Sequence, residues 1–210
     1  MTGKGGVGKT TLTALLAFAL HKAGKRVVAI DADPNATLAA SMGHPDPDAI
    51  RPLVEMKDLI EERTGVKPGT TGGMFRLNPF VEDIPEKYAV DIGGICVLVA
   101  GGIKKGGTGC YCPENALLRA LISHLLVEPN VALLLDMEAG LEHLGRGTVS
   151  AIDALLVVTE PSRGGVQTAR RIRKLAGDIG LKKLFGVGNK IRAGTDEGFL
   201  NRPYTWRSNG

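Results

Sequence analysis

Hydrophobic positions along this chain follow two alternating periods. Residues 9–23 repeat apolar side chains at helical spacing, with Leu12, Leu15 and Ala19 on one face. Residues 26–31 (RVVAID) instead form a short apolar run that ends in an acid, which is typical of a buried parallel strand. Because helical and strand-like segments keep alternating, the pattern predicts an α/β protein with a mostly parallel sheet and helices on both faces.

The same two signals predict the remaining elements. Further helices are expected at residues 53–63, 113–127 and 164–176, and further strands at 95–100, 131–136, 154–159 and 184–189. No internal repeat and no linker between two domains is visible in the pattern.

Composition narrows the class of protein only a little. The chain has 210 residues, enough for one α/β domain with a sizeable core, and a net charge of +4, which does not by itself indicate nucleic acid. No apolar run approaches the length of a membrane span, and the N-terminus does not resemble a signal peptide. We therefore expect a cytoplasmic protein with no membrane partner and no nucleic-acid partner.

The most informative motif is GKGGVGKT at residues 3–10, which matches the P-loop pattern G-x-x-x-x-G-K-[ST]. Its glycines let backbone N–H groups curl around a phosphate, Lys9 can reach the β- and γ-phosphates, and the Thr10 hydroxyl suits Mg²⁺. The sequence therefore predicts ATP and Mg²⁺ as cofactors. The expected ATP-binding residues of this segment are Gly3, Lys4, Gly5, Gly6, Val7, Gly8, Lys9, Thr10 and Thr11.

Polar residues lie at the carboxyl ends of three of the expected strands, the third of which ends at Asn189 and is followed by Lys190. Asp33 comes after residues 26–31, and Asp136 ends residues 131–136 in the manner of a Walker B strand. We expect Thr10, Asp33 and Asp136 to hold Mg²⁺, Asp33 also to orient the attacking water, and Gly140 to offer its N–H to the γ-phosphate. Each acid taken singly is also compatible with a strand-end cap or a turn.

Lys4, a second lysine inside the loop, narrows the class further. With the acids above, it resembles the deviant-Walker ATPases, which include the cell-division and plasmid-partition ATPases and the nitrogenase iron protein. The resemblance implies an ATP-sandwich homodimer in which Lys4 reaches the partner's nucleotide, so that Lys4, Lys9 and Asp33 are the catalytic residues. It also implies that Asn189 and Lys190 contact the adenine base and that Pro161 lies near it.

The domain limits follow from this resemblance. Residues 1–195 are expected to form a P-loop ATPase domain, and residues 196–210 an irregular tail. Only Met1 and Thr2 precede the loop, so we expect no strand before it. The first strand and the C-terminal part of the family's domain are then absent, which predicts impaired folding and turnover.

A second motif is the pair Cys110 and Cys112, which precedes the helix that begins at Pro113. Two cysteines at i and i+2 in an extended segment point their sulfurs to the same side. A tetrahedral site needs four ligands, and a two-fold dimer axis through the pair would supply the other two. The alternative is two partly buried structural cysteines, and Cys96, in an apolar strand, is best interpreted as a core residue.

Residues 106–115 (GGTGCYCPEN) and 136–148 (DMEAGLEHLGRGT) closely resemble the carbon monoxide dehydrogenase accessory ATPases of the CooC type. This resemblance implies a metallochaperone that binds Ni²⁺ or Zn²⁺ at Cys110 and Cys112 in a homodimer. It also implies carbon monoxide dehydrogenase as the client, into which the protein helps to insert nickel.

Three other interpretations stay open. A partition- or division-type ATPase would act on DNA or a membrane, and a basic face at residues 170–174 is compatible with DNA, although a solvated helix face explains it better. An electron-transfer protein would share a [4Fe–4S] cluster across the dimer. An inactive remnant would bind little.

Overall fold

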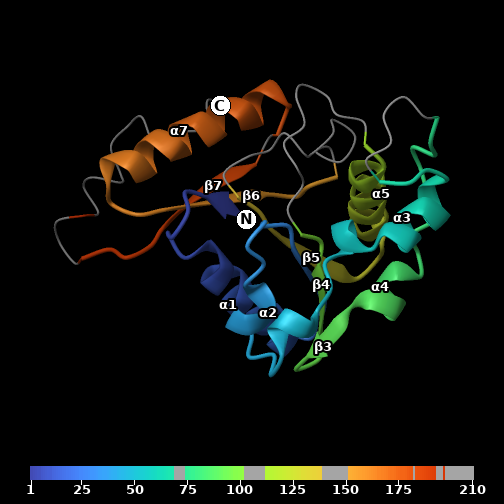
Figure 1. The fold of residues 1–210 in the computed structure, drawn as a ribbon. Coiled ribbons are helices and arrows are strands. Elements are labelled where there is room, and N and C mark those ends of the chain that lie inside the picture. The colour runs from blue at the N-terminus through green and yellow to red at the C-terminus, as the bar shows by residue number, and fades with distance from the viewer. Residues whose placement is uncertain (69–73, 102–111, 139–150, 182, 193–195, 197–210) are drawn as a thin grey trace. The chain divides into compact units, whose positions relative to one another are not determined.

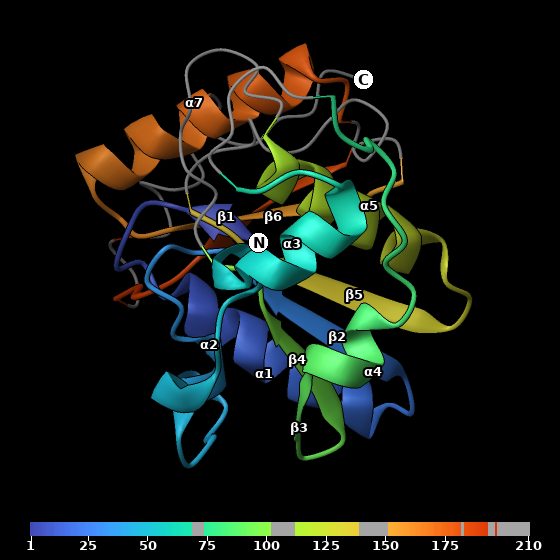
Figure 2. The same ribbon diagram turned by 45° about the vertical axis from the view of Figure 1, so that its right-hand side comes forward.

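The computed structural model describes residues 1–68, 74–101, 112–138, 151–181, 183–192 and 196. The chain divides into two compact units. One combines Met1–Leu12 with Met137–Gly210, and the other is Thr13–Asp136. Both units are drawn in Figures 1 and 2.

The unit Thr13–Asp136 is built on a four-stranded sheet of order β3-β4-β2-β5. Strands β2 (Arg26–Asp31), β4 (Ile95–Val99) and β5 (Val131–Asp136) are parallel, and β3 (Val90–Ile92) is an antiparallel edge strand. Successive β2 side chains point to opposite faces, so Val28 and Ile30 enter one apolar cluster while Val27 and Ala29 enter another. This double burial is why β2 has a continuous apolar sequence.

Helices cover both faces of this sheet. One cluster draws on α3 (Lys57–Thr64), α4 (Ile84–Tyr88) and α5 (Pro113–Val127), which lie together on one side of the strands in Figure 2. The other draws on α1 (Lys9–Lys22) and α2 (Leu38–Ser41). Two 3-10 turns, η1 (Pro47–Ala49) and η2 (Leu53–Glu55), also lie in this unit.

The other unit has a three-stranded, fully parallel sheet of order β1-β6-β7. Its strands are β1 (Thr2–Gly3), β6 (Leu155–Thr159) and β7 (Leu184–Gly188). Helix α7 (Arg163–Asp178), orange in Figure 1, buries Ala169, Ile172 and Ala176. The helix begins at Ser162, whose hydroxyl accepts a hydrogen bond from the Gly165 N–H at 3.0 Å.

Most of the predicted elements are confirmed, and the bounds of β2, α5 and β5 match the predicted ranges. The predicted helix 53–63 is interrupted at Met56, where ψ is 76°, so it becomes η2 followed by α3. The sequence did not predict α2, α4 or β3, which are three to five residues long and carry no clear period. Instead of one sheet, the described residues form two, one of which has an antiparallel edge.

The expectation of no strand before the P-loop is wrong. Thr2 and Gly3 pair with Val157 and Val158 of β6, and the Met1 carbonyl accepts from the Met137 N–H at 3.0 Å. The Thr2 hydroxyl, which is buried, donates to the Glu138 carbonyl at 2.7 Å. A two-residue strand has no detectable sequence period, but pairing on both sides is enough to fix the start of the loop.

Asp83, at the start of α4, joins α4 to α3. Its carboxylate binds the buried Arg63 guanidinium at 2.7 Å and the Lys87 ammonium at 2.8 Å. Hydrogen bonds from Lys87 and Arg63 lower the pKa of Asp83 to about 2. The Arg63 guanidinium also lies over the Phe80 ring, 5.3 Å from its centroid.

We expect the stabilisation from Asp83 to be complete above its ordinary pKa of 3.8 and lost as the pH falls through about 2. The substitution Asp83→Asn should lower the melting temperature at pH 7 and reduce the difference in urea stability between pH 5 and pH 3. Glu86→Gln, an exposed residue of the same helix, is the matched control. A pH dependence that is the same in Asp83→Asn and in the wild type would contradict this assignment.

Candidate nucleotide-binding site

The P-loop begins where β1 ends, against the neighbouring strand β6. A Cβ atom at Gly3 would collide with the Val158 carbonyl oxygen, so only glycine fits beside β6. Lys4, Gly5 and Gly6 then follow on the surface, and Val7 returns to the interior with no exposed area. The loop is therefore held at its start by sheet pairing and at its middle by one buried apolar side chain.

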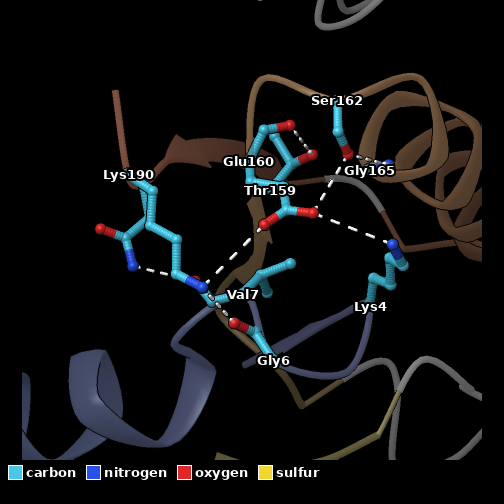
Figure 3. A network of polar contacts seen from close by, with 9 residues as sticks. Lys4, Gly6, Val7, Thr159, Glu160, Ser162, Gly165 and Lys190 are labelled. Atoms are coloured by element: carbon cyan, nitrogen blue, oxygen red, sulfur yellow. Dashed lines mark hydrogen bonds and ion pairs between the residues drawn. The ribbon is translucent and has the colours of Figure 1, made fainter. Parts of the chain in front are cut away.

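Two side chains that follow β7 donate hydrogen bonds to the middle of the P-loop, and this pair of hydrogen bonds is called the brace below. Asn189 donates from Nδ2 to the Val7 carbonyl at 2.8 Å, and Lys190 donates from Nζ to the Gly6 carbonyl at 2.7 Å. Figure 3 shows the Lys190 side chain approaching the loop at Gly6. In a trans peptide the N–H points opposite to the C=O, so these two bonds direct the N–H groups of Val7 and Gly8 to the other side of the loop. Successive N–H groups turned to one side are what an anion-binding loop requires.

Gly8 connects the loop to α1. Its φ is +92°, and a Cβ atom there would collide with Nδ2 of Asn189, so both the backbone and the brace require glycine. Helix α1 then begins at Lys9, with the Leu12 N–H donating to the Gly8 carbonyl at 3.0 Å. Lys9 is buried, with 6% of the residue exposed, and Thr10 is half-buried. At a helix N-terminus, a lysine ammonium can donate to phosphate oxygens and a hydroxyl oxygen can coordinate Mg²⁺. Lys9 and Thr10 therefore fit a polyphosphate and its Mg²⁺ ion.

Glu160 lies at the end of β6, the central strand of this sheet. Its Oε1 is 3.8 Å from Nζ of Lys4 and accepts a hydrogen bond from the Ser162 hydroxyl at 3.1 Å. Its Oε2 is 4.0 Å from Nζ of Lys190. One carboxylate thus faces two lysines that the sequence assigned to the nucleotide, as Figure 3 shows. Glu160 was not among the site residues predicted from the sequence.

In the other unit, Asp31 organises the segment that carries Asp33. Asp31 ends β2 and is buried, and its Oδ1 and Oδ2 accept from the N–H groups of Asp33 at 3.0 Å and Leu38 at 2.8 Å. The Asp33 Oδ1 in turn accepts from the Asn35 N–H at 2.9 Å, which closes an Asx turn. The half-buried Asp33 is therefore presented by a turn whose backbone is fixed by the Asp31 carboxylate.

Asp136 is the neighbour of Asp31 at the carboxyl end of the same sheet. The β2–β5 register pairs the two residues directly, and Asp136 has no exposed area. Burial, followed in smaller measure by the charge of Asp136, raises the pKa of Asp31 to about 6. Two carboxylates at adjacent strand ends have the donor chemistry of a Mg²⁺ site, and a divalent cation would favour their charged forms.

The predicted thiolate pair is described only in part. Cys112 is half-buried at the N-cap of α5, with φ −103° and ψ 153°, so it is extended as expected. Cys110 and Gly140 lie outside the described residues. Within the described ranges, no group of three or more histidine, cysteine or acidic residues is arranged to hold a metal ion. Cys96 packs against the core, and burial raises the pKa of its thiol, in agreement with its interpretation as a core residue.

The predicted ATP-binding residues at 3–11, together with Pro161, Asn189 and Lys190, all fall in the unit that contains β1, β6 and β7. Asp33, Asp136 and Cys112 fall in the other unit. Asn189 and Lys190 were expected to contact the base, which stays a prediction; in the structure both donate hydrogen bonds to P-loop carbonyls. Their position after an apolar strand was visible in the sequence, but their distance from residues 6 and 7 was not.

The fold and the braced P-loop define a nucleotide-binding protein of the P-loop class. Residues 1–202 match the CobQ/CobB/MinD/ParA nucleotide binding domain, and the chain belongs to this family. The chain is 48% identical over 202 residues to the carbon monoxide dehydrogenase accessory protein CooC of Rhodospirillum rubrum, which covers 95% of this chain and 76% of that protein. It is 47% identical over 192 residues to an ATP-binding protein of Methanocaldococcus jannaschii, covering 91% and 74%.

Solved structures agree with this assignment. The MinD cell division protein of Aquifex aeolicus superposes with a TM-score of 0.60 at 26% identity, covering 91% of this chain and 68% of that one. A ParA family ATPase of Chlorobium tepidum gives 0.63 at 17% identity, covering 97% and 78%, and supports the fold alone. The predicted family, α/β P-loop fold and ATPase class are thereby confirmed. Among the described residues, no helix is long and apolar enough to cross a membrane.

The brace can be tested separately from any contact with the base. We expect Asn189→Ala to speed amide hydrogen exchange at residues 7–10 in the nucleotide-free protein, because one hydrogen bond to the loop is lost. Nucleotide affinity should fall by about three- to tenfold. Mass-spectrometric exchange and titration of a fluorescent ATP analogue measure the two effects. Unchanged exchange at these residues would show that Asn189 does not order the loop.

Proposed function

We propose that this chain is an ATP-hydrolysing accessory protein of carbon monoxide dehydrogenase that helps to deliver nickel to that enzyme. The observation that carries the proposal is the braced P-loop with its additional lysine, Lys4, in a chain that is 48% identical to CooC. The P-loop supports nucleotide binding, and the identity along 95% of the chain supports the particular client.

In this proposal, different residues of the chain bind the phosphates, orient the attacking water and bind the base. The N–H groups of the loop and the ammonium of Lys9 hold the phosphates and stabilise charge on the transferred phosphoryl group. Asp33 orients the attacking water, and the Gly140 N–H supports the γ-phosphate. Thr10, Asp33 and Asp136 are the residues that would hold Mg²⁺, which would supply positive charge to the phosphate oxygens. Asn189, Lys190 and Pro161 bind the base.

The active form in this proposal is a homodimer with ATP at its interface. Lys4 of each protomer contacts the partner's nucleotide, as the family resemblance implies. Cys110 and Cys112 of both protomers together supply four thiolates to one Ni²⁺ or Zn²⁺, which is the cargo. Closure on ATP forms or strains the metal site, and hydrolysis releases the metal or the partner protein.

The metal site is tested by native mass spectrometry with and without a non-hydrolysable ATP analogue and Mg²⁺. We expect one metal ion per nucleotide-loaded dimer and its loss in the double variant Cys110→Ser/Cys112→Ser, because only thiolates from two chains complete four ligands. Cys96→Ala is the matched control, since Cys96 is a core cysteine and should leave the stoichiometry unchanged. Metal retained by the double variant would refute the site.

A second candidate function rests on one basic surface patch. Arg170, Arg171 and Lys174 are exposed on α7, and this patch is suited to a polyanion such as DNA. ATP-dependent DNA binding that weakens steeply with salt, together with no metal in the dimer, would support a partition-type ATPase instead. The exposed face of a solvated helix explains the same residues without DNA.

A further inference from the structure

The position of Glu160 between two lysines follows from the order of the strands around it. Strands β1, β6 and β7 are parallel and adjacent, so the residues that follow them meet at one edge of the sheet. Lys4 follows β1, Glu160 follows the central strand β6, and Lys190 follows β7. The carboxylate of Glu160 therefore lies between two ammonium groups, at 3.8 Å from Lys4 and 4.0 Å from Lys190.

The two lysines depend on Glu160 to different degrees. Lys190 has a second and shorter contact, because its Nζ donates to the Gly6 carbonyl at 2.7 Å. For Lys4 the structure gives Glu160 as the ionic partner, and the Lys4 side chain is 49% exposed. Removing the Glu160 carboxylate should therefore release Lys4 and leave Lys190 on the loop.

The location of Lys4 would be unfavourable without that carboxylate. Its Nζ lies beside the first turn of α7, at 3.3 Å from where a Cβ atom of Gly164 would be. The N-terminus of a helix carries partial positive charge and repels a cation. Because Glu160 offsets this repulsion and is itself oriented by the Ser162 hydroxyl, it keeps Lys4 against its own chain.

We propose that Glu160 holds Lys4 within its own protomer and thereby opposes formation of the ATP-dependent dimer. This inference rests on the proposed function, in which Lys4 must leave its own chain to reach the partner's nucleotide. Dimer formation then exchanges the carboxylate partner of Lys4 for phosphate oxygens. The ion pair is half-exposed and therefore weak, so it adjusts the nucleotide concentration needed for the dimer without preventing it.

The first experiment measures the contact in the nucleotide-free protein. Limited acetylation of amines, read by mass spectrometry, should modify Lys4 faster in Glu160→Gln than in the wild type, while Lys190 changes little. Glu160→Asp keeps the charge on a shorter side chain and should give an intermediate rate. Asp178→Asn removes one negative charge at the other end of α7 and is the matched control. Equal Lys4 rates in the wild type and in Glu160→Gln would overturn the proposal.

The second experiment measures dimer formation by sedimentation with Mg²⁺ and a non-hydrolysable ATP analogue. Each dimer breaks two Lys4–Glu160 pairs, so Glu160→Gln should tighten the dimer by about two- to thirtyfold, with no change in Asp178→Asn. A dimer that is unchanged or weaker in Glu160→Gln would overturn the role of Glu160 and leave the proposed function standing. A wild-type chain that stays monomeric with the nucleotide would overturn both.

Discussion

The candidate site depends on one pair of hydrogen bonds, from Asn189 and Lys190 to consecutive carbonyl groups of the P-loop. A glycine-rich loop has many accessible backbone conformations, and ordering it costs more conformational entropy than ordering other residues. These two bonds turn the carbonyls of Gly6 and Val7 to one side and so their partner N–H groups to the other. Because Nδ2 of Asn189 also occupies the space that a side chain at residue 8 would need, the brace and the glycine pattern require each other.

The strands determine which residues can take part in this arrangement. In the sheet β1-β6-β7, parallel pairing brings the ends of three strands to one edge, where they carry Lys4, Glu160 and Asn189 with Lys190. In the sheet β3-β4-β2-β5, the same geometry pairs Asp31 with Asp136. Ligands of open α/β sheets bind beyond the carboxyl ends of the strands, and each sheet places its polar residues there. Apolar residues fill the strands themselves, which separates the packing of the core from the chemistry of the site.

Asp31 and Glu160 had no role predicted from the sequence. Both contact residues whose roles were predicted. Asp31 accepts hydrogen bonds from the backbone around Asp33, and Glu160 faces Lys4 and Lys190. Neither acid belongs to a motif with fixed spacing, so neither could be distinguished from a strand-end cap by pattern alone. A buried carboxylate that accepts two N–H groups stabilises a turn, whereas a half-exposed one between lysines forms weaker and reversible contacts. Asp31 is therefore suited to a fixed turn, and Glu160 to an exchangeable contact.

The sequence by itself determined the class, the family and most elements of regular structure. The P-loop is recognisable because its chemistry needs particular residues at fixed spacing, and β2, β5 and α5 are recognisable because burial imposes a period on their side chains. The tertiary structure decided the rest. The two-residue strand β1, the brace on residues 6 and 7, and the contact of Glu160 with two lysines all join residues far apart in the chain. Such contacts depend on strand order and register, which local periodicity does not encode.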